Sequence, residues 1–149
     1  MLTINNILAL STLSLFKPLS VTISKKKWNS CFLLVNIITF SFLHHLTETN
    51  EVGHNLDGNE KLFFLNKYSF LFRYLDIFFS YILFGYMVYD SGISIVFSFI
   101  ISNKIIFILF FINFICDFII SNQPWLYLFL HFIWHSGISF ILLKYYQNK

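Results

Sequence analysis

The last hydrophobic stretch of the chain, residues 125–146, reads WLYLFLHFIWHSGISFILLKYY. A helix needs about 20 predominantly apolar residues to cross the hydrocarbon core of a bilayer, and this stretch is long enough. It carries two histidines, His131 and His135, one helical turn apart on one face. That spacing suits the binding of one cation from a single helix. A histidine in a spanning helix is costly and normally faces the protein interior, so the pair indicates a functional site.

The composition assigns the whole chain to the membrane class. Of its 149 residues, 57% are hydrophobic and only 11% are charged, whereas soluble domains carry about a quarter charged residues. We therefore predict one all-α domain, residues 1–149, folded as a multi-pass transmembrane helical bundle. The net charge of +3 is small, and no basic stripe is present, which argues against a nucleic-acid partner. Cys31 and Cys116 lie in apolar stretches and predict no disulfide framework.

About five membrane spans are predicted, at residues 5–22, 28–46, 70–89, 105–121 and 125–146. The first span is weakly apolar, and a helix lying on the membrane surface is the alternative for it. Residues 47–61 hold four of the seven acidic residues and no apolar run, which predicts a polar loop. Residues 91–104 are predicted to form a short re-entrant or interfacial piece, because their apolar run is too short to cross.

The densest positive cluster, Lys25–Lys27, lies between the first two predicted spans. The positive-inside rule places this turn on the cytoplasmic side. A single crossing at residues 105–121 returns the C-terminal lysines, Lys144 and Lys149, to the same side. The sequence does not identify which cellular membrane holds the protein.

This topology brings four polar side chains to similar depths in the outer half of the bilayer. His45 ends the second span, and Asp76 lies in the first two turns of the third. His131 and His135 lie roughly 9 and 15 Å below the outer start of the last helix, at 1.5 Å per residue. Three histidines with an open fourth position make a familiar catalytic zinc shell. We therefore predict zinc bound by His45, His131 and His135.

Two further residues are candidates for catalysis beside that metal. Asp76 could orient a ligand or handle protons, and Ser41, one turn before His45, could hydrogen-bond substrate or water. The alternative is that each histidine only hydrogen-bonds one helix to another. His44 is left out of the site because it points about 100° away from His45 on a helix. His54 is expected to be solvated, and Asp90 and Asp117 are expected to be interfacial or helix-end groups.

The order of these residues resembles the CREST superfamily, which contains alkaline ceramidases, adiponectin-receptor-like proteins and related membrane metallohydrolases. Within it the chain is similar to the myomaker and post-GPI-attachment phospholipase branch, the transmembrane protein 8 family. The segments FSFLHHLTE, YLDIFFSYILFGYMVYD and LYLFLHFIWHSGISFILL carry the likeness in family order. The similarity covers about residues 8–90 and 105–146.

The resemblance implies a zinc ion held by the three histidines, with Ser41 and Asp76 beside it. It also implies hydrolysis of lipid amides or esters by a water molecule that the metal activates, with membrane lipids as partners. Because the myomaker branch is linked to cell–cell fusion, a non-catalytic membrane or fusion factor is the alternative.

The length of the chain departs from the family pattern. Family members usually have seven spans, and the missing helices would fall between Asp90 and Ile105. Since about two are absent, an even number, the last helix keeps its orientation. A truncated, inactive remnant is a third hypothesis, and a homo-oligomer could replace the missing helices.

Overall fold

A computed structural model describes residues 4–47, 68–119 and 124–149 of the chain. Every regular element in these residues is a helix, which confirms the all-α class. In chain order they are α1 (Ile4–Ser11), the 3-10 turn η1 (Thr12–Leu15), α2 (Phe16–Ser24), α3 (Trp28–Thr47), α5 (Ser69–Ser91), α6 (Ile93–Ser102), α7 (Ile105–Ile119) and α8 (Pro124–Gln147).

Four helical stretches of the described chain are long and apolar enough to cross a membrane. They are Asn6–Ser24, Trp28–Thr47, Ser69–Ser91 and Trp125–Gln147. The 20 residues of α3 correspond to about 30 Å of helix, which is the thickness of a hydrocarbon core. The architecture is therefore that of an integral, multi-pass membrane bundle.

The segment between α5 and α8 differs from a straight fifth crossing. The 15 residues of α7 give a helix of only about 22 Å. α6 and α7 together have the length of a span, but they bend by 80° at the break between them. Residues 93–102 of the predicted short piece are thus the helix α6, and a fifth span exists only if the bent pair counts as one.

Asn103 lies at the bend and holds it in place. Its side-chain amide donates to the Phe99 carbonyl over 2.6 Å at the end of α6. Lys144 of α8 donates to the Asn103 amide oxygen over 2.7 Å. The corner is therefore tied to the last helix by a partly buried polar contact.

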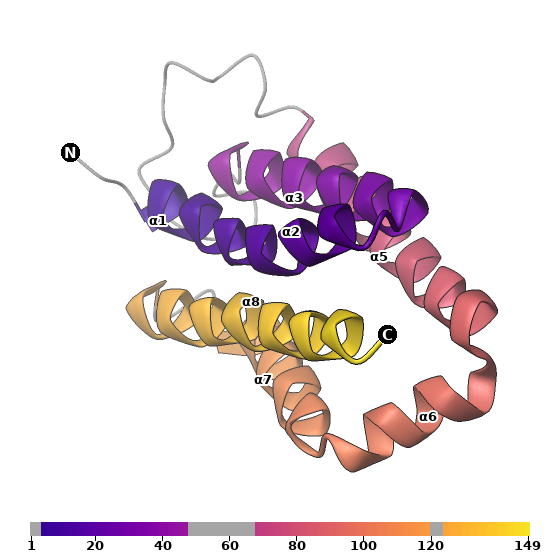
Figure 1. The fold of residues 1–149 in the computed structure, drawn as a ribbon. Coiled ribbons are helices and arrows are strands. Elements are labelled where there is room, and N and C mark those ends of the chain that lie inside the picture. Colours follow the sequence, from indigo (N-terminus) through magenta and orange to yellow (C-terminus); the bar gives the residue numbers. More distant parts are fainter. Residues whose placement is uncertain (1–3, 48–67, 120–123) are drawn as a thin grey trace.

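The first helical segment lies at the centre of the arrangement (Figure 1). α1, η1 and α2 pack against both α3 and α8, whereas α5 pairs with α3, and α7 pairs with α8. Within the described residues, α3 and α8 approach each other in few places. The bundle therefore consists of two helix pairs joined by the N-terminal segment.

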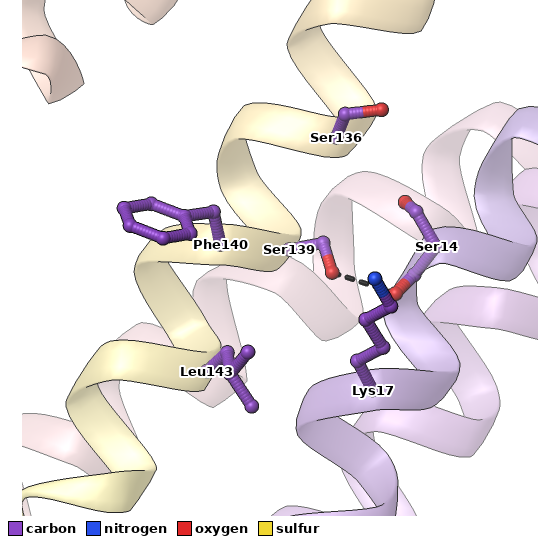
Figure 2. A pocket seen from close by; sticks show the side chains of 6 residues that line it. All are labelled: Ser14, Lys17, Ser136, Ser139, Phe140 and Leu143. Carbon is purple, nitrogen blue, oxygen red and sulfur yellow. Dashed lines mark hydrogen bonds between the residues drawn. The ribbon is translucent and has the colours of Figure 1, made fainter.

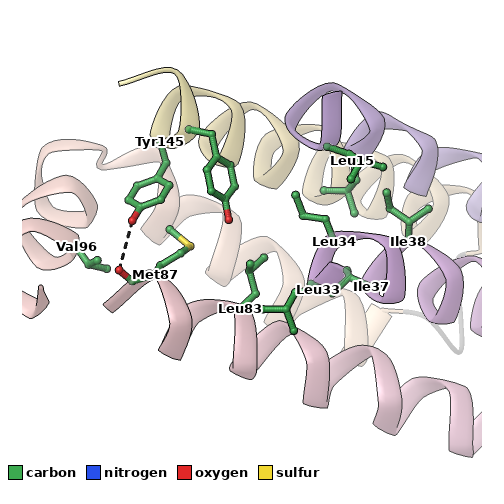
Figure 3. Close-up of a cluster of buried hydrophobic side chains, with 11 residues drawn as sticks. Leu15, Leu33, Leu34, Ile37, Ile38, Leu83, Met87, Val96 and Tyr145 are labelled. Atoms are coloured by element: carbon green, nitrogen blue, oxygen red, sulfur yellow. Dashed lines mark hydrogen bonds between the residues drawn. The ribbon is translucent and has the colours of Figure 1, made fainter. Parts of the chain in front are cut away.

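The largest hydrophobic cluster joins α2, α3, α5, α6 and α8 (Figure 3). α3 contributes two adjacent rows of aliphatic side chains, and α8 contributes its last two tyrosines. The buried members are Leu15, Leu19, Leu33, Leu34, Ile37, Ile38, Leu83, Met87, Val96, Tyr145 and Tyr146. This cluster occupies the half of the bundle nearest the C-terminal end of α8, away from the histidines.

The turn of three lysines between α2 and α3 closes with a Schellman motif. The Lys27 amide donates to the Thr22 carbonyl over 2.8 Å, and the Lys26 amide donates to the Ile23 carbonyl over 3.0 Å. Lys26 has a φ of 56°, in the left-handed region that glycine normally occupies in this motif. The turn reverses the chain so that α3 runs back along α2.

Ion pairs join this turn to the ends of α5 and α8. Lys27 and Asp90 form an ion pair of 3.0 Å, and Lys149 approaches the same carboxylate at 3.8 Å. Lys25 donates to the Gln147 carbonyl over 2.9 Å. The lysine turn, the end of α5 and the C-terminus therefore meet at one end of the bundle, called the basic end below.

Several predicted features fall outside the described residues. The polar loop predicted at residues 47–61 lies outside them, with His54, except that Thr47 is the last residue of α3. Residues 122–123, before the last helix, also lie outside them.

Candidate metal centre

His45 ends a continuous buried stripe on α3. Leu33, Ile37, Ser41 and His45 are four residues apart and all buried, because positions i and i+4 lie on the same helix face. The two aliphatic residues join the hydrophobic cluster, and the two polar ones follow toward the end of the helix. The His45 imidazole therefore faces the interior of the bundle, because its position continues the buried helix face that the aliphatic residues form.

A matching stripe on α8 contains the other two histidines. Tyr127, His131, His135 and Ser139 are also four residues apart and buried. The 3-10 turn η1 packs against this stripe: Ser14 donates its hydroxyl to the His135 carbonyl over 3.2 Å. Ser139 in turn donates to the Ser14 carbonyl over 2.6 Å. These bonds fix the height of α8 relative to the N-terminal segment.

The structure brings the three histidines into one cluster, with exposed fractions of 3% for His45, 9% for His131 and 6% for His135. The Nε2 atoms of His131 and His45 are 2.9 Å apart, and those of His135 and His131 are 3.0 Å apart. The third pair, His135 and His45, is separated by 3.3 Å. The helices therefore place three ring nitrogens at the corners of a small triangle.

Hydrogen bonds among the rings cannot account for this triangle. A ring nitrogen either carries a proton and donates or carries a lone pair and accepts. Among three nitrogens at least two are of the same kind, so at least one pair is donor against donor or acceptor against acceptor. At these separations, which are hydrogen-bond distances, that pair repels. A cation that accepts a lone pair from each nitrogen would remove the conflict.

The donor set and its spacing fit a zinc ion. Zinc takes imidazole nitrogens at about 2.0–2.1 Å in tetrahedral geometry, so two ligand nitrogens lie about 3.3 Å apart. The three observed separations, 2.9, 3.0 and 3.3 Å, come within about 0.4 Å of that value. In the part of the chain that the structure describes, no other group of three or more potential ligands comes together in this way.

The two predicted catalytic residues lie beside the cluster rather than in it. Ser41 is one turn before His45 and is 1% exposed, and its hydroxyl makes no hydrogen bond of ordinary geometry within the described residues. Asp76 of α5 is half-buried, and its carboxyl lies close enough to the Ser41 hydroxyl to interact with it. The Asp76 carboxylate does not belong to the group of mutually close ligand atoms.

His44, which the sequence excluded from the site, faces elsewhere. Its Nδ1 lies 3.3 Å from the Ser69 hydroxyl at the start of α5, and it is half-buried. It therefore links α3 to α5 and provides a natural comparison for His45.

Sequence reasoning missed two neighbours of the cluster. The Tyr127 ring lies 5.1 Å from the His131 ring and is one turn before it on the same face, a spacing that could have revealed it. The second is Ser14, whose hydroxyl donates to the His135 carbonyl. The two residues are far apart in the chain, so no local sequence pattern predicts this hydrogen bond.

The outer nitrogen of one cluster histidine is also unsupported. The Nδ1 of His131 is buried and has no hydrogen-bond partner in the described residues. A metal-binding histidine usually donates this second proton to an acceptor, and His131 lacks that support within the described residues.

Comparisons with protein-family models, curated proteins and solved structures find no match to this chain. The arrangement of its own residues is therefore what bears on function.

Proposed function

We propose that this chain is a membrane-embedded, zinc-dependent hydrolase of lipid amides or esters. The Nε2 triangle of His45, His131 and His135 is the observation that carries the proposal, because it cannot be satisfied by protons alone and fits a zinc ion. The resemblance of the polar residues to the CREST superfamily supplies the reaction class. The lipid nature of the substrate follows from the location of the site within apolar helices.

Each side chain has a separate role in this proposal. The three histidines hold the ion through Nε2. Bound zinc polarises a carbonyl and makes a water molecule more acidic. The Ser41 hydroxyl, which is buried without a hydrogen bond of its own, donates to an oxygen of the lipid substrate and orients it. A carboxylate oxygen of Asp76 accepts the proton that the attacking water loses and returns it to the leaving alcohol or amine.

The first experiment measures the zinc content of the detergent-purified chain by mass spectrometry. We expect about one zinc per chain, because three histidine ligands are typical of a single catalytic site. His45→Ala should abolish binding, and so should the double variant His131→Ala/His135→Ala. His44→Ala is the matched control, since it removes the adjacent imidazole and leaves the triangle intact. A well-folded protein without zinc would refute the proposal, and so would retention of zinc by His45→Ala.

The second measurement is turnover of ceramides and phospholipids by the zinc-loaded protein. Asp76→Asn should retain the metal and lose turnover by about 10²-fold or more, the usual contribution of acid–base catalysis. If Asp76→Asn were as active as the natural sequence, the role given to Asp76 would be wrong.

A second candidate function is a non-catalytic membrane or fusion factor in which the metal is structural. The observation that favours it is the sparse contact between α3 and α8. A metal held by His45 from one helix and by His131 and His135 from the other would join the two helix pairs directly. This hypothesis expects bound zinc, loss of folding or surface level on its removal, and no lipid product from the intact protein.

The orientation in the membrane is part of the same proposal. Lys25–Lys27, Asp90 and Lys149 gather at the basic end, and the positive-inside rule favours a cytoplasmic location for such a cluster. The histidines would then open toward the opposite leaflet. The variant Lys26→Cys tests this orientation. If the basic end is cytoplasmic, a membrane-impermeant thiol reagent added outside intact cells should not label the new cysteine.

A further inference from the structure

A second polar feature lies on the partly exposed side of the bundle, between the N-terminal segment and α8, one residue beyond His135 on α8. A hollow of about 250 Å³ is lined by two serines from α8, a serine and a lysine from the N-terminal segment, and two apolar side chains. Figure 2 shows these residues: Ser14, Lys17, Ser136, Ser139, Phe140 and Leu143. A cationic hollow within spanning helices is unusual, because charged groups there are costly and mark ligand or ion sites.

Lys17 is the charge in this hollow, and its depth places it in the hydrocarbon layer. It lies seven residues before Ser24, the last residue of the first candidate span, which is about 10 Å along the helix. A lysine at such a depth normally snorkels toward the nearer headgroups, here those at the basic end. Lys17 is exposed, and its side chain extends toward Ser14 and the hollow (Figure 2), as helical side chains tend to do.

The Lys17 ammonium group has no counter-ion among the described residues. Within residues 4–47, 68–119 and 124–149, its Nζ forms no ion pair and no hydrogen bond. The hydroxyls of Ser14 and Ser139 are already committed to carbonyls, whereas Ser136 makes no hydrogen bond in these residues. Two unused donors, an ammonium and a hydroxyl, therefore face one hollow, and both select for a negatively charged oxygen.

We propose that this hollow binds the carboxylate of a fatty acid. One carboxylate balances the single charge of Lys17 and accepts a hydrogen bond from Ser136. Phe140, which is 58% exposed, and Leu143 offer an apolar wall along which the acyl chain can lie. A phospholipid phosphate offers the same charge but carries a polar headgroup and glycerol backbone, which are costly to bury at this depth.

The site does not require the histidine cluster to be catalytic. Its donors are Lys17 of α2 and Ser136, which follows His135 but points about 100° away from it around α8, and they need no metal. A fatty acid is also the product that hydrolysis of a lipid ester or amide releases, so the two sites are chemically compatible.

The test uses oleic acid labelled with ¹³C at the carboxyl carbon, added to the full chain in phosphatidylcholine nanodiscs. NMR should show a carboxyl resonance distinct from that of oleic acid in protein-free discs, saturating at one per chain. The bound carboxylate should stay ionised to lower pH, because Lys17 stabilises its charged form. Oleyl alcohol, which has the same chain and no charge, should not displace it.

Variants separate the charge of Lys17 from general effects. Lys17→Met should weaken binding by about tenfold or more, the worth of a charge-assisted hydrogen bond. Lys17→Arg should retain binding, and so should Lys104→Met, which removes an exposed lysine outside the hollow. The double variant His131→Ala/His135→Ala should bind oleic acid as the natural chain does, which keeps this test independent of zinc.

Three results would overturn the proposal. The natural chain could show no distinct resonance, or Lys17→Met, with unchanged helical circular dichroism, could bind oleic acid equally well. The third result would come from nanodiscs in which phosphatidylglycerol replaces part of the phosphatidylcholine. If that lipid removes the oleic acid resonance through Lys17, the occupant is a phospholipid headgroup and not a fatty acid.

Discussion

The two ends of the bundle differ in how their polar groups are paired. At the basic end, Asp90 pairs with Lys27 and Lys149, and the Tyr145 hydroxyl meets Ser91 and the Met87 carbonyl. At the histidine end, three ring nitrogens face one another without a consistent pattern of donors and acceptors. The groups named at the basic end are thus paired within the described residues, whereas the three ring nitrogens cannot all be paired with one another. That difference distinguishes a structural polar cluster from a binding site.

The largest effect should come from removing the metal with a chelator. If zinc binds only the folded chain, a free concentration 100 to 1,000 times its dissociation constant stabilises the fold by about 3–4 kcal/mol. The natural chain should lose that amount, measured by thermal unfolding in detergent with and without chelator. His45→Ala should be insensitive to the chelator. If chelator lowered the stability of both proteins equally, the histidine end would hold no metal through His45, and the two ends would not differ as described.

Acidification should reproduce the chelator effect at the histidine end. Imidazole binds a metal only when its ligating nitrogen is deprotonated, so lower pH weakens a three-histidine site. Zinc content should fall as the pH is lowered, and the chelator-sensitive part of the stability should fall with it. Zinc that stays bound under acid would point to ligands other than histidine.

A change between the two ends tests helix packing separately from the metal. A Cβ added to Gly137 would lie 2.4 Å from a terminal carbon of Leu109, which is buried on α7. Gly137→Ala should therefore cost about 1–3 kcal/mol of unfolding free energy through overpacking, and zinc should remain bound. Gly85→Ala is the matched control, because a Cβ there meets nothing within 4 Å. Equal stabilities of the two variants would show that α7 and α8 are not tightly packed.

The smallest effect should come from the ion pairs of the basic end. Lys27 and Asp90 are partly exposed, with side-chain exposed fractions of 22% and 31%, and such pairs contribute about 1 kcal/mol or less. Asp90→Asn should lower the unfolding free energy by that amount at low salt and have a weaker effect in high salt. Its zinc content should equal that of the natural chain. A loss of metal would mean that the two ends are coupled.

The sequence predicted more of the histidine cluster than of the chain around it. His131 and His135 share a helix face by their spacing alone, and His45 joined them because the predicted topology placed all three at one depth. Asp76 was predicted at the same depth as a catalytic neighbour and not as a ligand, and its carboxylate is not among the mutually close ligand atoms. Depth along a helix follows from residue number, whereas rotation about the helix axis does not.

The segment before α8 was predicted in two pieces, a short re-entrant or interfacial piece at residues 91–104 and a crossing at residues 105–121. The structure has two separate helices there, α6 and α7, and the sequence did not predict that they meet at 80°. The bend depends on Asn103, whose side chain is held by Lys144 from 41 residues away. A local pattern cannot reveal such a contact.

The sequence by itself determined that the protein is helical, apolar and multi-pass, because a backbone within lipid must satisfy its hydrogen bonds inside each helix. It also determined which faces of α3 and α8 carry histidines, through the four-residue spacing. Only the tertiary structure decided that the ring nitrogens approach to 2.9–3.3 Å and that Lys17 lines a hollow with residues of α8. The physical reason is that helix periodicity is local, while the packing of α3 and α8 around the N-terminal segment depends on contacts more than 80 residues apart.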